Sequence, residues 1–113
     1  MCYNFGMYDY ERNTLSHITE RLRERFSERI IAVYAFGSRV RGDYHEWSDF
    51  DVLVVVRDRN ISIEHEIIDI FVEEELQSGV IFAPVIKDMK SFEYEKNLHT
   101  PFYENIMKEG VAF

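Results

Sequence analysis

The chain has 113 residues, with 13 Lys and Arg against 21 Asp and Glu and a formal net charge of −8. This length predicts a single domain over residues 1–113, and the acidic balance argues against a free nucleic-acid binder, which needs Lys and Arg to displace counterions from phosphates. No apolar stretch approaches the roughly 18 residues of a membrane span, the N-terminus lacks a signal-peptide pattern, and the single cysteine, Cys2, can form no intrachain disulfide, so we expect a cytoplasmic protein without a membrane partner.

The first half of the chain predicts a helix followed by two strands. Apolar residues recur at helical spacing over residues 9–26, and the arginines of this segment are expected to pair on its surface with Glu20 and Glu24. The nearly all-apolar runs Ile30–Phe36 and Phe50–Val56 predict buried strands, and the second run is rich in β-branched residues. Between them, residues 38 to about 42 are expected to form a short helix.

A turn at residues 58–60 separates the second strand from a longer helix. Ser62 is expected to cap the start of this helix, and Gly79 is expected to end it. Its apolar face would be formed by Ile63, Ile67, Ile70, Phe71 and Leu76. The run Val80–Ile86 then predicts a third strand, and Pro84 within it suggests an edge strand or a bulge.

The remaining residues predict two short helices. Ser91 is expected to cap one that runs through Leu98, and Thr100-Pro101 provides a good cap and first residue for another, which Gly110 ends. The resulting order, αβαβαβαα, predicts an α/β (α+β) fold in which helices pack on a small mixed β-sheet.

One constellation carries the chemical signal: Gly37-Ser38, ten intervening residues, then Asp49-Phe50-Asp51. Gly37 ends a buried strand where the backbone must turn and approach a ligand closely. Ser38 would start a helical turn, whose free N–H groups and hydroxyl suit a phosphate. Asp49 and Asp51 are two residues apart on a strand, so both carboxylates would project from the same face. A bound Mg²⁺ would neutralise their charge there.

A purely structural interpretation of the same residues is open. In it Ser38 only caps a helix, and Asp49 and Asp51 are surface acids at the start of a strand. Arg39 is expected to contact the phosphates of a nucleotide. A surface ion pair with Asp43 or Glu46 is an equally good interpretation of this arginine.

The stretch GSRVRGDYHEWSDFDVLVVV resembles the GS-x10-D-x-D motif of the nucleotidyltransferase superfamily that includes DNA polymerase β and kanamycin nucleotidyltransferase. The short chain is similar to the minimal branch of that superfamily, the MNT proteins encoded beside HEPN-domain partners. The resemblance implies a polymerase β-like nucleotidyltransferase fold. It implies that Gly37 and Ser38 hold the phosphates of a nucleoside triphosphate, with ATP as the expected substrate. It also implies that Asp49 and Asp51 are the catalytic residues and hold Mg²⁺.

The resemblance further implies transfer of a nucleoside monophosphate to a hydroxyl, expected on a HEPN toxin-like protein, with this chain serving as antitoxin. Active members usually carry a third carboxylate on a later strand, but the matching run Val80–Ile86 contains no acid. Asp88 follows this run and is a candidate for the role, whereas Glu73, Glu74 and Glu75 are expected to be solvated. The alternative is a catalytically weak nucleotide binder that acts by docking on a partner.

Overall fold

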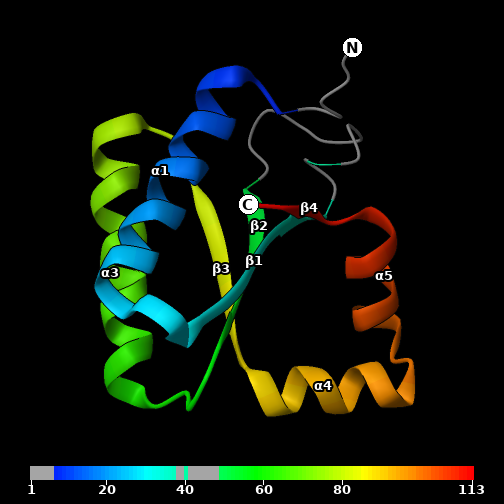
Figure 1. Ribbon diagram of the computed structural model, residues 1–113. Coiled ribbons are helices and arrows are strands. Elements are labelled where there is room, and N and C mark those ends of the chain that lie inside the picture. Colours follow the sequence, from blue (N-terminus) through cyan, green and yellow to red (C-terminus); the bar gives the residue numbers. More distant parts are fainter. Residues whose placement is uncertain (1–6, 38–39, 41–48) are drawn as a thin grey trace.

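The computed structural model describes residues 7–37, 40 and 49–113 (Figure 1). The N-terminal part is α1 (Asp9–Phe26), a 3-10 turn η1 (Ser27–Arg29) and β1 (Ile30–Phe36). Then come β2 (Phe50–Val56), α3 (Ile61–Ser78), β3 (Phe82–Asp88), α4 (Met89–Leu98), α5 (Pro101–Glu109) and β4 (Val111–Ala112). The first helix and first two strands have the predicted bounds. The short helix expected over residues 38–42 lies, except for Val40, outside the described residues.

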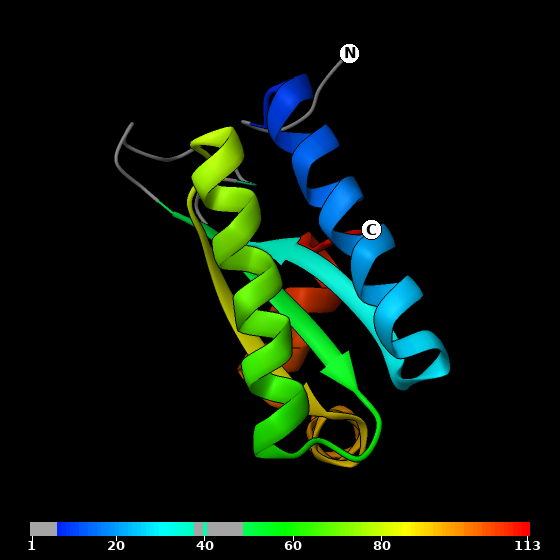
Figure 2. The ribbon, with the colours of Figure 1, turned by 90° about the vertical axis from the view of Figure 1, so that its left-hand side faces the viewer.

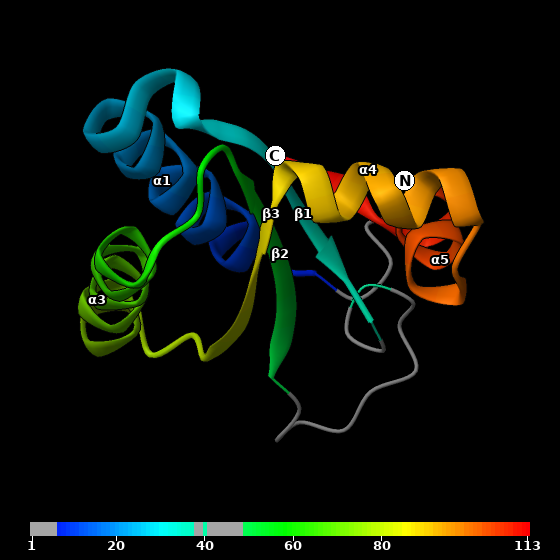
Figure 3. The ribbon, with the colours of Figure 1, turned by 90° about the horizontal axis from the view of Figure 1, so that it is seen from below.

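The strands form one mixed sheet in the order β3-β2-β1-β4, which confirms the predicted fold class. Strand β1 pairs antiparallel with both β2 and β4, whereas β2 and β3 run parallel. Helices α1 and α3 cover one face of the sheet, and α4 and α5 lie on the other (Figures 1 and 3). Within the described ranges, no helix is long and apolar enough to cross a membrane.

Strand β2 is buried on both faces, because each face packs against a helical layer. Val52, Val54 and Val56 belong to the core beneath α1 and α3. Leu53 and Val55 instead pack with Ile106 of α5 in a second, smaller core. Asp51 shares the face of Leu53 and Val55, since side chains alternate along a strand.

Two helix starts differ from the sequence prediction. Asn60, not Ser62, caps α3, and its side-chain oxygen accepts a hydrogen bond from the N–H of Ile63 at 2.9 Å. Asp88, not Ser91, caps α4, because the chain passes directly from β3 into this helix. Both corrections replace a serine with an equally good capping residue a few positions earlier. The predicted ends at Gly79, Leu98 and Gly110 and the cap at Thr100 are confirmed.

Strand β3 begins two residues later than predicted and is an edge strand, as Pro84 suggested. The carbonyl of Ile81 accepts a hydrogen bond from the N–H of Phe50 at 3.1 Å. The backbone N–H and C=O groups of successive residues point to alternate sides of a strand. Since those of Ile81 point toward β2, the N–H and C=O groups of the even-numbered residues of β3 point to the outer edge of the sheet. On that edge the N–H of Phe82 bonds to Glu75 at 3.4 Å, and Pro84 has no N–H to offer. The free edge is therefore poorly suited to pairing with another strand.

Two arginines of α1, Arg21 and Arg25, pair with acids of α3 instead of Glu20 and Glu24, which corrects the sequence prediction. Arg21 bonds Glu73 at 2.7 Å and Glu74 at 2.9 Å, and these bonds, that to Glu73 first, raise the pKa of Arg21. Glu74 is itself buried, so it is not solvated as expected. These ion pairs form between the two helices and not within α1, because α1 and α3 lie side by side on one face of the sheet (Figure 2).

Candidate functional site

Antiparallel pairing of the first two strands brings the two halves of the predicted constellation together. Phe36, the last residue of β1, is the register partner of Asp51 on β2, so Gly37 lies beside Asp51. Gly37 has φ +90°, a conformation that residues with a side chain rarely adopt. A Cβ at Gly37 would lie 2.3 Å from Oδ2 of Asp51, which is closer than any real contact. Glycine is thus required here by its backbone angle and by the carboxylate beside it.

The two aspartates stand at the start of β2. Asp51 is half-buried in the strand, and Asp49 is exposed immediately before it. Strand alternation extended by one residue puts Asp49 on the face of Asp51, with the two Cβ atoms about 6–7 Å apart. This is the face on which α4 and α5 lie. Two oxygen-donor groups at this spacing suit a hard divalent cation, while their exposure leaves room for water and phosphate ligands.

Ser38 and Arg39, the other predicted phosphate-binding residues, lie outside the described residues. Among the residues that are described, no group of three or more His, Cys, Asp or Glu side chains could hold a metal ion. Two of the histidines are paired with acids instead. His17 lies 3.3 Å from Glu74, and His99 lies 3.4 Å from Glu104.

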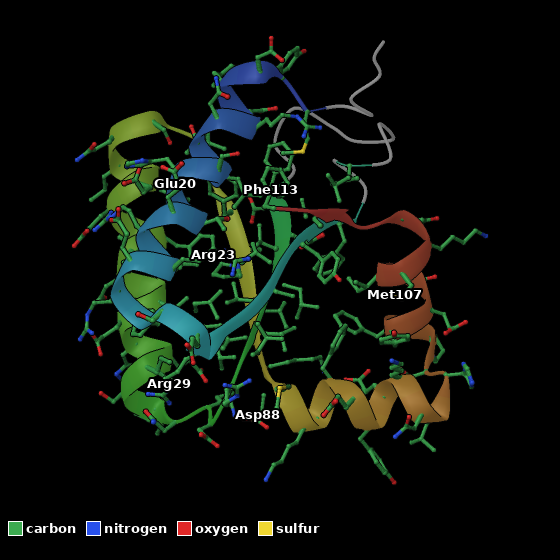
Figure 4. The ribbon with its side chains drawn as sticks, viewed as in Figure 1. Glu20, Arg23, Arg29, Asp88, Met107 and Phe113 are labelled. Carbon is green, nitrogen blue, oxygen red and sulfur yellow. The ribbon has the colours of Figure 1, made fainter. Side chains whose placement is uncertain are left out.

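Asp88 does not complete the site, because it lies at the opposite end of the sheet (Figure 4). In the parallel register Asp88 faces Val56, five residues along β2 from Asp51, or about 16 Å at the usual strand rise. Its carboxylate accepts hydrogen bonds from the N–H groups of Arg59 and Lys90, at 2.8 and 2.9 Å. These bonds, that of Arg59 first, lower the pKa of Asp88. Asp88 is a helix-capping residue and not a third carboxylate.

The position on β3 that faces Asp51 is occupied by Ala83. Register partners in a parallel pair point to the same face, so an acid at position 83 would project beside the carboxylate of Asp51. The flanking residues, Phe82 and Pro84, point to the other face and are not acids. Sequence patterns alone could not single out Ala83, because they do not fix the register between β2 and β3.

Lys87 lies on the same face of the sheet as Asp51, but its side chain is held by groups of α4 and α5 and not by the aspartates. It is the register partner of Val55, and its Nζ donates to Glu95 of α4 at 2.6 Å. The same Nζ lies 4.9 Å from the centre of the Phe102 ring of α5. The bond from Lys87, assisted by one from Thr100, lowers the pKa of Glu95. This cluster joins α4 and α5 to the sheet.

This architecture is that of a nucleotidyltransferase. The fold is similar to the crystal structure of a "putative nucleotidyltransferase" from Sulfolobus solfataricus, with a TM-score of 0.54 and 24% identity over 89% of this chain and 77% of that one. Residues 15–113 match the family model described as "Nucleotidyltransferase domain", so the chain belongs to this family and is a nucleotidyltransferase. Its substrate is a nucleoside triphosphate, and the family generally uses a divalent metal.

Two similar proteins come from Methanocaldococcus jannaschii, and each is named "putative protein adenylyltransferase". One is 28% identical over 100 residues, which cover 88% of this chain and 94% of the relative. The other is 32% identical over 85 residues, which cover 74% of this chain and 79% of the relative. The likeness therefore extends over most of the domain and is not limited to the glycine and aspartate motif.

Proposed function

We propose that this nucleotidyltransferase is Mg²⁺-dependent and transfers AMP from ATP to a hydroxyl group of a protein. The observation that carries the proposal is the contact of Gly37 with Asp51, which sets a glycine turn directly against a strand-borne carboxylate. The choice of AMP and of a protein acceptor is supported by the names of the two relatives.

Asp49 and Asp51 fit a magnesium site, because both offer hard carboxylate oxygens at the open end of a buried strand. When bound there, Mg²⁺ would neutralise charge on the triphosphate and favour in-line displacement. The residues at the turn after β1 would contact the β- and γ-phosphates. In this assignment Gly37 lets the backbone approach them, and Ser38 and Arg39 donate hydrogen bonds to them.

The acceptor hydroxyl oxygen forms a bond to the α-phosphorus of ATP, the bond from that phosphorus to the bridging oxygen breaks, and pyrophosphate leaves. The hydroxyl proton must pass to a base or to water. Since Ala83 occupies the β3 position beside Asp51, this strand supplies no carboxylate for the proton. We therefore expect slow transfer by the isolated protein and faster transfer when an acceptor protein brings the missing group.

The partner that we propose is a HEPN-domain protein, which this chain would modify and thereby inhibit as an antitoxin. The support is the likeness to the minimal branch of the superfamily described above together with the protein-directed names of the relatives. Labelled-ATP transfer measured with and without a co-expressed HEPN protein tests this part. Label that appears only on the HEPN protein is expected, whereas label on neither protein would refute it.

The metal and nucleotide site is tested with the double variant Asp49→Asn/Asp51→Asn. We expect calorimetry to show loss of Mg²⁺-dependent ATP binding with an unchanged thermal transition. The control is Asp58→Asn/Asp69→Asn, which removes the same charge from exposed positions away from the site and should bind as the parent does. Equal Mg²⁺-ATP affinity in the parent and in the Asp49/Asp51 variant would show that both acids are structural.

Ala83 favours one alternative, a nucleotide-binding protein with little catalytic power that acts by docking on its partner. Both functions predict Mg²⁺-ATP binding, so binding alone does not separate them. They differ in single-turnover experiments with the partner present. A labelled acceptor supports the transferase, while retained binding without any labelled acceptor supports the docking protein.

A further inference from the structure

Helix α3 carries an apolar stripe on the side that faces away from the sheet. Ile61, Ile68, Val72 and Leu76 are exposed by 73%, 38%, 45% and 82%. Their spacing of seven, four and four residues puts them on one side of the helix, opposite to the buried face of Ile63, Ile67, Ile70 and Phe71. The stripe extends for about 22 Å along the helix axis. Figure 2 looks onto this helix, and no described element covers its outer side.

The neighbours of α3 do not account for the stripe. Helix α1 meets α3 along a different side, through the ion pairs of Arg21 with Glu73 and of Arg25 with Glu66. On the remaining side Glu75 bonds the first N–H of β3, and Pro84 removes a donor from the same edge. A partner that covers the stripe is expected to be a helix, because an apolar stripe along one helix packs against a matching stripe on another.

Charge decides between the possible occupants. The sequence of α3 contains six acids and no Lys or Arg: Glu64, Glu66, Asp69, Glu73, Glu74 and Glu75. Arg21, Arg25 and Arg59 pair with four of these acids, and six acids against three arginines leave an excess of three negative charges on this side of the molecule. A second copy of this chain would bring two such negative surfaces together, and like charges repel. An anionic membrane surface would be repelled in the same way. A helix with its own apolar stripe flanked by Lys and Arg complements both the shape and the charge.

The stripe ends near the candidate active site. Phe71 of α3 packs against Phe82 at 5.9 Å between ring centres, and Phe82 packs against Phe50 at 5.8 Å. Phe50 directly follows Asp49, so the part of α3 that carries Val72 and Leu76 lies at the end of the sheet where β2 begins. A helix docked along the stripe would lie beside the end of the sheet at which nucleotide transfer is proposed.

We propose that this stripe docks a Lys- and Arg-rich amphipathic helix of the acceptor protein and so brings the acceptor to the nucleotide. The inference rests on the proposed transferase function, but the docking itself can be measured separately. The probe is a 21-residue helical peptide with Leu at the two core positions of each heptad, Lys at the flanking positions and a terminal Gly-Ser extension. A peptide with Glu in place of every Lys serves as the charge control.

Calorimetry or fluorescence anisotropy with the intact chain should show saturable binding of the Lys peptide, weakening as salt is raised, and none of the Glu peptide. Val72→Ser/Leu76→Ser should weaken binding at least tenfold, because it removes two exposed anchors without disturbing the core. The matched control is Tyr94→Ser/Met107→Ser, which removes exposed apolar side chains from α4 and α5 and should bind as the parent does.

Four outcomes would overturn the proposal, and three of them come from the peptide assay: no binding of the Lys peptide, equal binding of the Glu peptide, or equal weakening by the control variant. A parent dimer that Val72→Ser/Leu76→Ser converts to a monomer in sedimentation would assign the stripe to a second copy, which also overturns it. Asp49→Asn/Asp51→Asn separates docking from transfer. It should bind the peptide as the parent does while losing labelled-ATP transfer, so a parent that binds peptide but no nucleotide would refute only the proposed function.

Discussion

Substitution of Gly37 by alanine tests whether the position of Asp51 matters for nucleotide transfer. The new Cβ would lie 2.3 Å from Oδ2 of Asp51 and 3.2 Å from its Cγ. The carboxylate must therefore move by about 1 Å before an ordinary contact is restored, and misplacement of a reacting group by this much can cost on the order of 10²-fold in rate. The backbone adds strain of about 1–3 kcal/mol, because alanine is disfavoured at φ +90°.

The structure supplies a matched control at Gly79, which ends α3 with φ +77° and has no atom within 4 Å of a built Cβ. Gly79→Ala suffers the backbone strain but displaces nothing. In urea unfolding, both variants should lose about 1–3 kcal/mol of stability. In Mg²⁺-ATP binding and labelled transfer, only Gly37→Ala should lose function, with a rate lower on the order of 10²-fold.

Comparison of the two variants separates strain from site geometry. If Gly37→Ala kept the parent's affinity and rate while its stability fell, the carboxylate position would not be needed, and the assignment of Asp51 to the active site would be wrong. If Gly79→Ala lost function to the same extent, the effect would be due to stability alone. Assays are run well below the midpoint of both unfolding curves, so that the folded fraction is the same.

Three further predictions concern β3 and its surroundings. Asp88→Ala should lower the melting temperature by loss of a cap and leave the transfer rate unchanged; a collapse of the rate would restore Asp88 as a base. Ala83→Asp should raise transfer by up to about 10²–10⁴-fold, the usual contribution of a general base, and an unchanged rate would show that position 83 does not face the nucleophile. The ion pair with Lys87 lowers the pKa of Glu95 from 4.5, so its stabilisation is present above that pH and is lost as the pH falls through the lowered pKa. Glu95→Gln should therefore flatten the dependence of melting temperature on pH in this acidic range, and an unaltered profile would contradict the pairing.

The sequence was sufficient to predict elements whose signal is local. Helical spacing of apolar residues predicted α1, and two apolar runs predicted β1 and β2 at their observed bounds. Thr100 with Pro101 and Gly110 predicted the start and the end of α5, because caps and stops depend on adjacent residues. β4 was missed, since Val111–Ala112 is too short to show any periodicity and is held by its pairing with β1.

Errors arose where a residue's role depends on distant contacts. Leu76 was assigned to the apolar face of α3 but is 82% exposed, because it lies on the side of the helix that faces away from the buried residues. Arg21 was assigned to a neighbour on its own helix, but the facing acids of α3 lie within bonding distance. By contrast, the motif grouped Gly37 with Asp51, and the antiparallel register of β1 and β2 places the two residues side by side.

The third carboxylate shows most clearly the difference between what adjacent residues predict and what depends on distant contacts. The sequence established that the third strand lacks an acid before Asp88, and it left that residue as a candidate. The register between β2 and β3 excludes it, because Asp88 pairs with Val56 and Ala83 pairs with Asp51. The two ends of β3 therefore differ in role, since the start borders the aspartates and the end caps α4. Under the proposed function, a chain that keeps the glycine turn and both aspartates but has alanine at the facing position would still hold a nucleotide. Rapid proton removal would then depend on the acceptor, which would confine efficient transfer to a docked partner.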